Sequence, residues 1–176
     1  MTPAQASAQV DPVAELLAGM TVEERVGQLF IVPFVGPDVG DNSNIAEIIV
    51  EYKIGGVVLL AANQNFTNDD TTPRQVTVLA NQLQGLALAN SSVPLFVAID
   101  HEGDGWPYTR ITGGVTPLPS PMAVGATWDP SSAEAIGDIV GQELSAMGIN
   151  LLLGPSVDVL YDPRPTGRGD IGIRAY

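Results

Sequence analysis

The sequence predicts an α/β fold in which parallel strands alternate with helices. The main observation is a set of four short apolar runs, each followed by a loop and then by a helical pattern. The runs are rich in Val, Ile and Leu and lack polar alternation, which is typical of strands covered on both faces. They lie at residues 29–34, 55–60, 95–99 and 150–159.

Two helices are predicted ahead of the first strand. A short helix is expected to begin near Asp11 and Pro12. Thr21 and Glu24 have the spacing of a capping box, in which each side chain accepts a hydrogen bond from the other residue's backbone N–H. A second helix is therefore predicted from about Val22.

Three longer helices follow from apolar residues that repeat at helical spacing. The helix between the first two strands is expected to end at residues 55–56, which are both Gly. The next helix has Thr72 as its predicted N-cap and Pro73 in its first turn. The last begins at residues 129–130 and stops at Gly148. The predicted buried faces are Ile45, Ile48, Ile49 and Tyr52; Val76, Leu79, Ala80, Leu83 and Leu86; and Ala133, Ile136, Ile139, Val140 and Leu144.

This order of elements is compatible with two architectures. One is an open, doubly wound sheet, and the other is half of a (β/α)8 barrel, which needs about 250 residues to close. In both, right-handed crossovers make the strands parallel, and ligands bind at their carboxyl ends. Residues 61–63, Asp100 onward and Asp158 onward are therefore expected along one rim.

The charge and the Cys and His content of the chain exclude several classes of partner and metal site. The chain has 176 residues, of which 45% are hydrophobic, and a formal net charge of -13. This charge repels nucleic acid and anionic lipid, so we expect neither as a partner, and no apolar run is long enough to span a bilayer. With no Cys and one His, thiolate and multi-His metal sites are excluded within one chain. Glycine-loop nucleotide motifs are absent, so we expect no metal and no cofactor.

Residues 1–11 are predicted to be a flexible segment ahead of a domain at residues 12–176. The segment is small, polar and uncharged up to Asp11, and it lacks the basic and apolar regions of a signal peptide. It fits either the remnant left after export or the start of an expressed chain, so localisation stays open.

The stretch VAIDHEGDGWPYTRI, residues 97–111, is the main candidate site. Asp100 directly follows the third predicted strand, where a carboxylate held by the sheet can accept hydrogen bonds from sugar hydroxyls. It can equally pair with Arg110 in a structural network. His101, the only imidazole, is a candidate general base or hydrogen-bond donor to substrate, or else a structural hydrogen-bonding group.

The same stretch matches the first half of an EF-hand calcium loop at Asp100, Glu102, Asp104 and Gly105. Position twelve, where a bidentate Glu is required, is Ile111, and a strand precedes the loop in place of a helix. We therefore expect no calcium here.

The last stretch, residues 154–176, has Asp158 after the fourth predicted strand and three of the seven basic residues, Arg164, Arg168 and Arg174. Arginine forks bind carboxylates and can hold hydroxyls. The alternative is a solvated tail, rich in Pro and Gly, that neutralises an acidic protein.

Six segments in order resemble the N-terminal domain of glycoside hydrolase family 3. They are MTVEERVGQLF, IGGVVLL, VAIDHEG, LPSPMAVGAT, GINLLLGPSVDV and GIRAY, within a match that extends from about Pro12 to Tyr176. The resemblance implies a TIM (β/α)8 barrel, of which this chain is the first half. It also implies a retaining glycosidase that works without a metal and removes terminal β-linked glucose, N-acetylglucosamine or related sugars.

By this resemblance Asp100 holds sugar hydroxyls, and Arg110 and Arg174 correspond to arginines of the family's motifs. We assign these three residues to substrate binding, together with His101 and Asp158. The chain departs from the family's usual D-x-E-G-G by having Asp104 and two extra residues before Arg110. A second departure concerns the family's catalytic residues. Its Lys-His motif, its acid/base and its nucleophilic Asp all come later in the family's sequences than the position of Tyr176.

We therefore expect residues 12–176 to be a half-barrel that supplies part of a sugar-binding rim and lacks the catalytic pair, so that the chain alone is inactive. The alternative is a non-catalytic half-barrel that binds sugar or assembles with itself. A half-barrel exposes two sheet edges and an apolar interior, which predicts a homodimer, a complementary C-terminal half as partner, or poor solubility. An open flavodoxin-like sheet with an anionic cofactor is disfavoured by the acidic rim.

Overall fold

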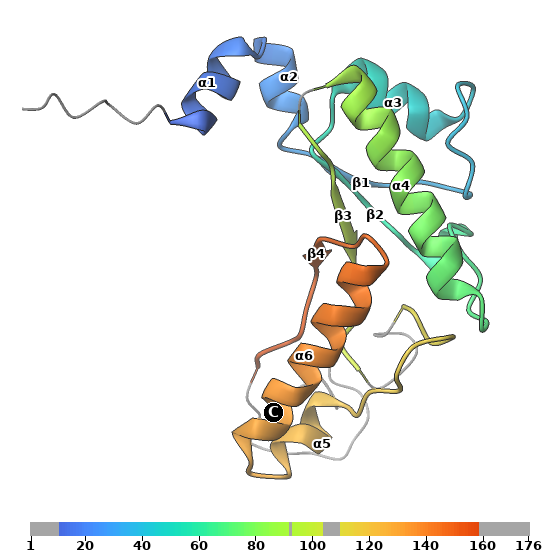
Figure 1. The fold of residues 1–176 in the computed structure, drawn as a ribbon, viewed down its shortest axis with the longest axis vertical. Coiled ribbons are helices and arrows are strands. Elements are labelled where there is room, and N and C mark those ends of the chain that lie inside the picture. The colour runs from blue at the N-terminus through green and yellow to red at the C-terminus, as the bar shows by residue number, and fades with distance from the viewer. Residues whose placement is uncertain (1–10, 92, 104–109, 159–176) are drawn as a thin grey trace, which may run out of the picture.

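The structure is a computed structural model that describes residues 11–91, 93–103 and 110–158. Four parallel strands form one sheet in the order β1-β2-β3-β4 (Figure 1). They are β1 (Ile31–Pro33), β2 (Gly56–Val58), β3 (Phe96–Ile99) and β4 (Leu151–Leu152). The predicted α/β class with parallel strands is confirmed. The strand order follows the chain without reversal, as in a barrel and unlike a doubly wound sheet.

Each strand is shorter than the apolar run that predicted it. The largest difference is at β4, where the described part of the run, residues 150–158, contains only two strand residues. Two short helices were not predicted at all: the 3-10 helix η1 (Ala61–Asn63) and α5 (Pro121–Gly125). The other helices are α1 (Pro12–Gly19), α2 (Val22–Gly27), α3 (Asn44–Tyr52), α4 (Thr72–Asn90) and α6 (Pro130–Ala146).

Three of the predicted helix starts are confirmed, including that of α1, which begins at Pro12 with Asp11 as its N-cap. At α2 the Thr21 hydroxyl accepts from Glu24 N at 3.1 Å, and Thr21 N donates to Glu24 Oε2 at 2.9 Å. At α6 Asp129 is the N-cap, and its carboxylate accepts from Ser131 N at 3.0 Å. Both caps satisfy backbone N–H groups that have no partner within the helix.

Two other helix boundaries were predicted wrongly. The N-cap of α4 is Thr71 and not Thr72, because the Thr72 hydroxyl donates to the carbonyls of Thr67 and Asp69 in the turn before the helix. The helix α3 ends at Tyr52, and its C-cap is Lys53, which adopts a left-handed φ of 50°, so the helix stops before the two glycines. Gly56 serves another purpose: a Cβ there would lie 2.6 Å from the Phe96 carbonyl oxygen of β3.

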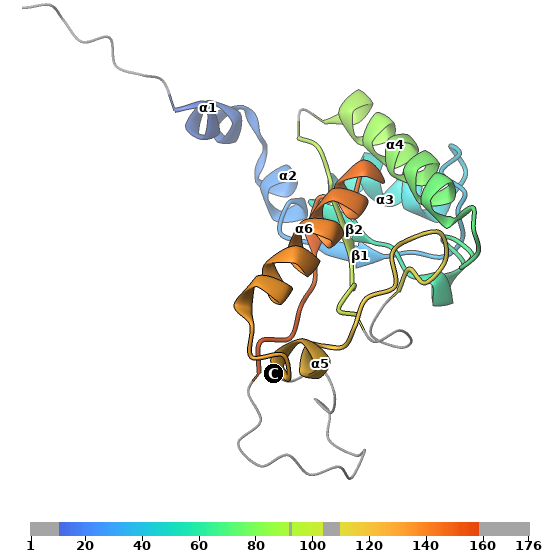
Figure 2. The ribbon, with the colours of Figure 1, turned by 60° about the horizontal axis from the view of Figure 1, so that its bottom comes forward.

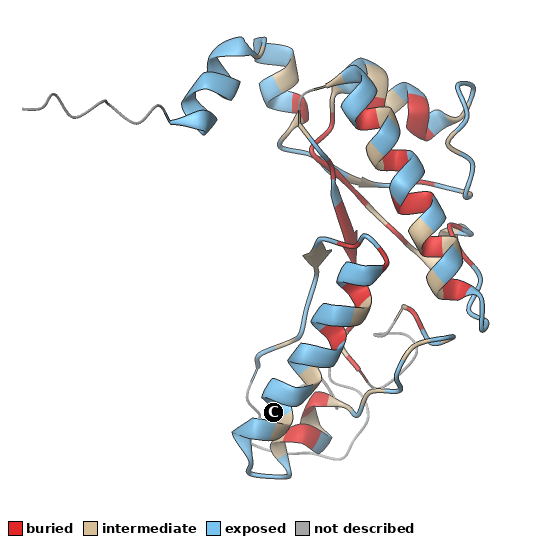
Figure 3. Cartoon of the chain, viewed as in Figure 1, coloured by how far each residue is buried: buried red, intermediate tan, exposed pale blue. Residues whose placement is uncertain are grey.

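One face of the sheet is covered by helices. Val32, Val57 and Val97 are in register across β1, β2 and β3, and the latter two are fully buried. They belong to one apolar cluster with the buried sides of α3, α4 and α6, which appear as red stripes in Figure 3. Three residues of the predicted helix faces are exposed and not buried, namely Tyr52 at 61%, Ile139 at 37% and Ala133 in the first turn of α6.

The opposite face of the sheet is open. Alternation along the strands places Ile31, Gly56 and Phe96 on this face, followed by Pro33, Val58 and Ala98. Ile31 and Phe96 are 39% and 52% exposed. A parallel sheet normally has both faces covered, whereas in residues 11–91, 93–103 and 110–158 the helices cover one face of this sheet.

Candidate substrate-binding site

Asp100 is positioned by β3. It follows Ile99 directly, and strand alternation places it on the open face, two residues after Ala98. Arg110 donates from Nη2 and Nε to Asp100 Oδ2 at 2.9 and 3.3 Å, and Arg110 N donates to the Asp100 carbonyl at 3.2 Å. The pairing that the sequence left open is therefore present.

This ion pair has both of its side chains partly exposed, Arg110 at 24% and Asp100 at 30%. No hydrogen bond from the described part of the chain reaches Asp100 Oδ1. A carboxylate with one oxygen held and the other accessible is suited to accept hydrogen bonds from hydroxyl groups.

Asn68, in the loop after β2, holds the segment that contains Arg110. Its side chain donates from Nδ2 to the Arg110 carbonyl at 2.9 Å and accepts at Oδ1 from Thr112 N at 2.9 Å. Between these two bonds, the Ile111 side chain is fully buried. The loop after β2 thus fixes the backbone on both sides of Ile111 and, with it, the arginine that holds Asp100.

Asn65 connects the loops that follow β1 and β2. Its side chain is 1% exposed, donates from Nδ2 to the carbonyls of Phe34 and Gly36 at 3.2 and 2.8 Å, and accepts from Leu60 N at 2.8 Å. Asn63 adds a bond from its Nδ2 to Phe34 O at 3.0 Å. The sequence analysis placed residues 61–63 on the rim but missed Asn65 and Asn68. The sequence feature that could have identified them is the repeated Asn in AANQNFTN, directly after the second predicted strand.

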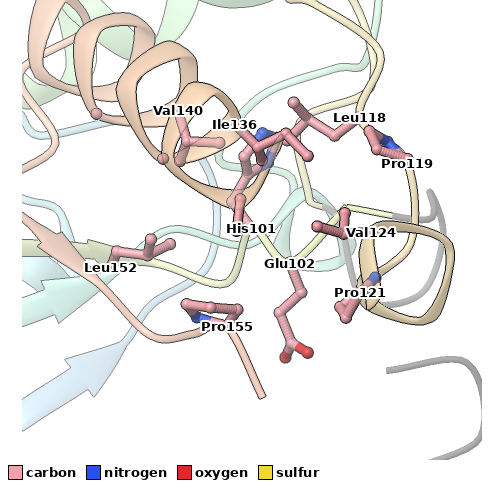
Figure 4. A pocket seen from close by; sticks show the side chains of 13 residues that line it. His101, Glu102, Leu118, Pro119, Pro121, Val124, Ile136, Val140, Leu152 and Pro155 are labelled. Atoms are coloured by element: carbon pink, nitrogen blue, oxygen red, sulfur yellow. The ribbon is translucent and has the colours of Figure 1, made fainter. Parts of the chain in front are cut away.

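His101 lies on the other side of the sheet from Asp100. Consecutive strand residues face opposite sides, and the His101 imidazole is only 3% exposed, beside Ile136 and Val140 of α6 (Figure 4). Burial lowers the pKa of His101, and the Glu143 carboxylate of α6 partly opposes this. A role for His101 as a direct sugar ligand stays a prediction.

The two remaining predicted residues are not brought to Asp100 by any described contact. Asp158 is exposed in the segment after β4, where its carboxylate accepts from the Ser156 hydroxyl at 2.8 Å. Arg174 lies outside the described residues, as do Asp104 of the calcium-loop pattern and the N-terminal residues 1–10. Their roles stay predictions.

The described residues contain neither a cluster of metal ligands nor a membrane-spanning helix. In residues 11–91, 93–103 and 110–158 no three His, Asp or Glu side chains are grouped so that they could hold a metal ion. No helix within the same ranges is long and apolar enough to cross a bilayer.

Comparison with known families settles the relationship of the chain. The family described as "Glycosyl hydrolase family 3 N terminal domain" matches residues 21–176. The chain belongs to glycoside hydrolase family 3. The family prediction from the six segments is thus confirmed, and Asp100 and Arg110 lie within the matched domain.

Two curated relatives are named for different activities. The chain is 36% identical over 124 residues to beta-hexosaminidase A of Pseudoalteromonas piscicida, covering 68% of this chain and 19% of the relative. It is 29% identical over 161 residues to the periplasmic beta-glucosidase of Salmonella typhimurium, covering 92% of this chain and 18% of the relative. The chain therefore spans about a fifth of the length of either protein.

A solved family 3 structure supports the fold. The β-N-acetylglucosaminidase from a Paenibacillus species is 36% identical, with a TM-score of 0.77 that covers 90% of this chain and 28% of that one. Together with the strand order, this similarity confirms the predicted parallel (β/α) units of a TIM-like barrel.

Proposed function

We propose that this chain supplies part of the sugar-binding rim of a retaining β-glycosidase that removes terminal β-linked glucose or N-acetylglucosamine. The observation that supports this most directly is Asp100, held by Arg110 at the carboxyl end of β3 on the open face of the sheet. Ligands of barrel enzymes bind at this end of the strands. The printed names of the relatives, a β-hexosaminidase and a β-glucosidase, agree with both sugars.

The catalytic pair is proposed to lie outside these 176 residues. A retaining glycosidase needs two carboxyl groups about 5 Å apart, one as nucleophile and one as acid/base. Asp100 is occupied by an ion pair with Arg110. By family resemblance its duty is to hold sugar hydroxyls, so it is assigned neither catalytic role.

The open face of the sheet is proposed to be covered by a complementary half-barrel or by a second copy of the chain. The support is apolar exposure on that face: Ile31 at 39%, Phe96 at 52% and Leu153, directly after β4, at 39%. The backbone groups on the outer edges of β1 and β4 have no neighbouring strand among the described residues. A complete barrel would pair the free strand edges and would bury the exposed apolar side chains, because its strands close on one another and side chains fill its interior.

The test combines light scattering with NMR and activity measurements on the purified chain. Glucose and N-acetylglucosamine are added for saturation-transfer NMR, and chromogenic β-glucoside and β-N-acetylglucosaminide report turnover. We expect weak sugar binding without turnover, with binding lost in Asp100→Asn and kept in Asp138→Asn, an exposed carboxylate on α6. Binding that survives Asp100→Asn would overturn the assignment of Asp100.

Turnover by the purified chain would overturn the proposal that the catalytic pair lies elsewhere, whatever its oligomeric state. The second candidate function is a non-catalytic sugar-binding module. The native reading frame distinguishes it from the glycosidase. A frame that continues beyond Tyr176 into a Lys-His motif and a later strand ending in Asp supports the enzyme, and a stop codon supports the module.

A further inference from the structure

Asn68 joins two segments that are distant in sequence. Figures 1 and 2 show the green loop that leads into α4 beside the yellow segment that starts at residue 110. The Asn68 side chain is exposed, and so are its two bonds, to the Arg110 carbonyl and from Thr112 N. Because water can replace either partner of an exposed bond, these two bonds contribute little to global stability. Their main effect is to fix where the second segment lies.

The backbones of the two segments also touch, next to the Asn68 bonds. A Cβ on Gly113 would lie 2.6 Å from the Asp69 nitrogen, and a Cβ on Gly114, where φ is 69°, would lie 2.6 Å from Pro73 Cδ. The loop is itself held by the Asp69 carboxylate, which accepts from Thr71 N at 2.7 Å. A fixed loop with glycines packed against it thus determines the path of the segment that begins with Arg110.

The position of Arg110 decides which oxygen of Asp100 is accessible. Both guanidinium bonds to Asp100, at 2.9 and 3.3 Å, go to Oδ2. Arginine and carboxylate commonly pair through both carboxylate oxygens. An Arg110 side chain that moved into that geometry would occupy Asp100 Oδ1, the oxygen that is suited to accept from a sugar hydroxyl.

We infer that Asn68 is a positioning residue of the sugar-binding site, which acts through Arg110 to keep Asp100 Oδ1 available to a sugar hydroxyl. This inference rests on the proposed function of Asp100. Asn68 Nδ2 holds the Arg110 carbonyl, and Arg110 N donates to the Asp100 carbonyl at 3.2 Å. The Arg110 backbone is therefore fixed from both sides, and its guanidinium approaches Asp100 at one oxygen.

The first test measures the effect of Asn68→Ala on Arg110 by NMR of the ¹⁵N-labelled chain. The Arg110 Nε–Hε signal is assigned by its loss in Arg110→Lys. We expect Asn68→Ala to speed exchange of this Hε with solvent about tenfold, because the bonds that fix the segment are lost. Gly113→Ala forces the same two segments apart and should act in the same direction, whereas Asn90→Ala, at an exposed Asn of α4, should change nothing. Equal exchange in Asn68→Ala and the unaltered chain overturns the inference.

The second test measures binding of N-acetylglucosamine by saturation-transfer NMR. We expect Asn68→Ala to weaken binding about tenfold, while its urea midpoint stays close to that of the unaltered chain. Arg110→Lys lacks the arginine fork, so adding Asn68→Ala to it should weaken binding no further. A merely structural effect of Asn68 would add to that of Arg110→Lys, and such additivity overturns the inference.

Asp100→Asn separates failure of this inference from failure of the proposed function. If Asp100→Asn abolishes binding and Asn68→Ala leaves it unchanged, the proposed function stands and Asn68 does not position the site. If binding survives Asp100→Asn, or if the unaltered chain does not bind the sugar, the proposed role of Asp100 fails and the inference fails with it.

Discussion

Replacing Asn65 by Ala tests whether the loops after β1 and β2 are held by one side chain. The substitution removes three hydrogen bonds of 2.8 to 3.2 Å from a side chain that is 1% exposed. At about 1 kcal/mol for each bond, the free energy of unfolding should fall by about 3 kcal/mol. With a urea m-value of about 2 kcal/mol per molar, the unfolding midpoint should fall by about 1.5 M.

A matched Asn variant supplies the control for this measurement. Asn90 at the end of α4 makes one exposed bond from Nδ2 to the Leu86 carbonyl at 2.9 Å, so Asn90→Ala should change the free energy of unfolding by no more than about 0.5 kcal/mol. Asn65→Asp keeps the acceptor for Leu60 N but puts a buried carboxylate oxygen against the carbonyls of Phe34 and Gly36, so its midpoint should lie at or below that of Asn65→Ala. If Asn65→Ala and Asn90→Ala shift the midpoint equally, the reasoning is refuted.

Three further predictions concern pH, packing and local exchange. Burial lowers the pKa of His101 in the folded chain below 6.5, so just below that pH the unfolded chain binds more protons than the folded chain. The free energy of unfolding should therefore fall as the pH drops below about 6.5. Urea titrations of His101→Gln should show a smaller fall over the same pH range. Gly56→Ala should destabilise the chain by about 1–3 kcal/mol, because its Cβ would meet the β3 backbone, whereas Gly85→Ala on α4 meets nothing within 4 Å and should stabilise it slightly in thermal melts. Asn68→Ala should speed hydrogen exchange at the Thr112 amide, and an unchanged rate would argue against Asn68 as an anchor of that segment.

The elements that could be predicted from sequence are those determined by local chemistry. The Thr21 and Glu24 capping box and the Asp129 N-cap need only neighbouring residues, and both form as expected. Apolar repeats also located α4, whose Val76 and Leu83 are fully buried.

The features that were missed depend on contacts outside the helix itself, some with the preceding turn and some with residues distant in sequence. Thr72 is an acceptable N-cap by residue type, but its hydroxyl is drawn to the carbonyls of Thr67 and Asp69 in the preceding turn. Lys53 ends α3 in a left-handed conformation that residue type does not suggest, and its side chain donates to the Asn90 carbonyl at 2.8 Å, 37 positions along the chain.

The candidate site shows the same division. The position of Asp100 at the end of a strand follows from sequence pattern, whereas its pairing with Arg110 was one of two alternatives that the sequence left open and the structure contains. The role of Asn68 does not, because its two bonds join it to residues 42 and 44 positions later in the chain. Such an asparagine can be suspected from its place after a strand, but its partners are determined only by the folded structure.

The alternation of β3 explains how adjacent polar residues can have unrelated roles. Asp100 and His101 are neighbours in sequence, yet strand geometry directs their side chains to opposite faces of the sheet. The open face leaves Asp100 30% exposed in its ion pair with Arg110, while the helix-covered face buries His101 to 3% beside an apolar cavity. A shift of one residue in β3 would place the imidazole on the rim and bury the carboxylate among apolar side chains, where an unpaired charge is strongly unfavourable. The register of β3 against β2 and β4 therefore determines which of these two residues lies on the open face of the sheet.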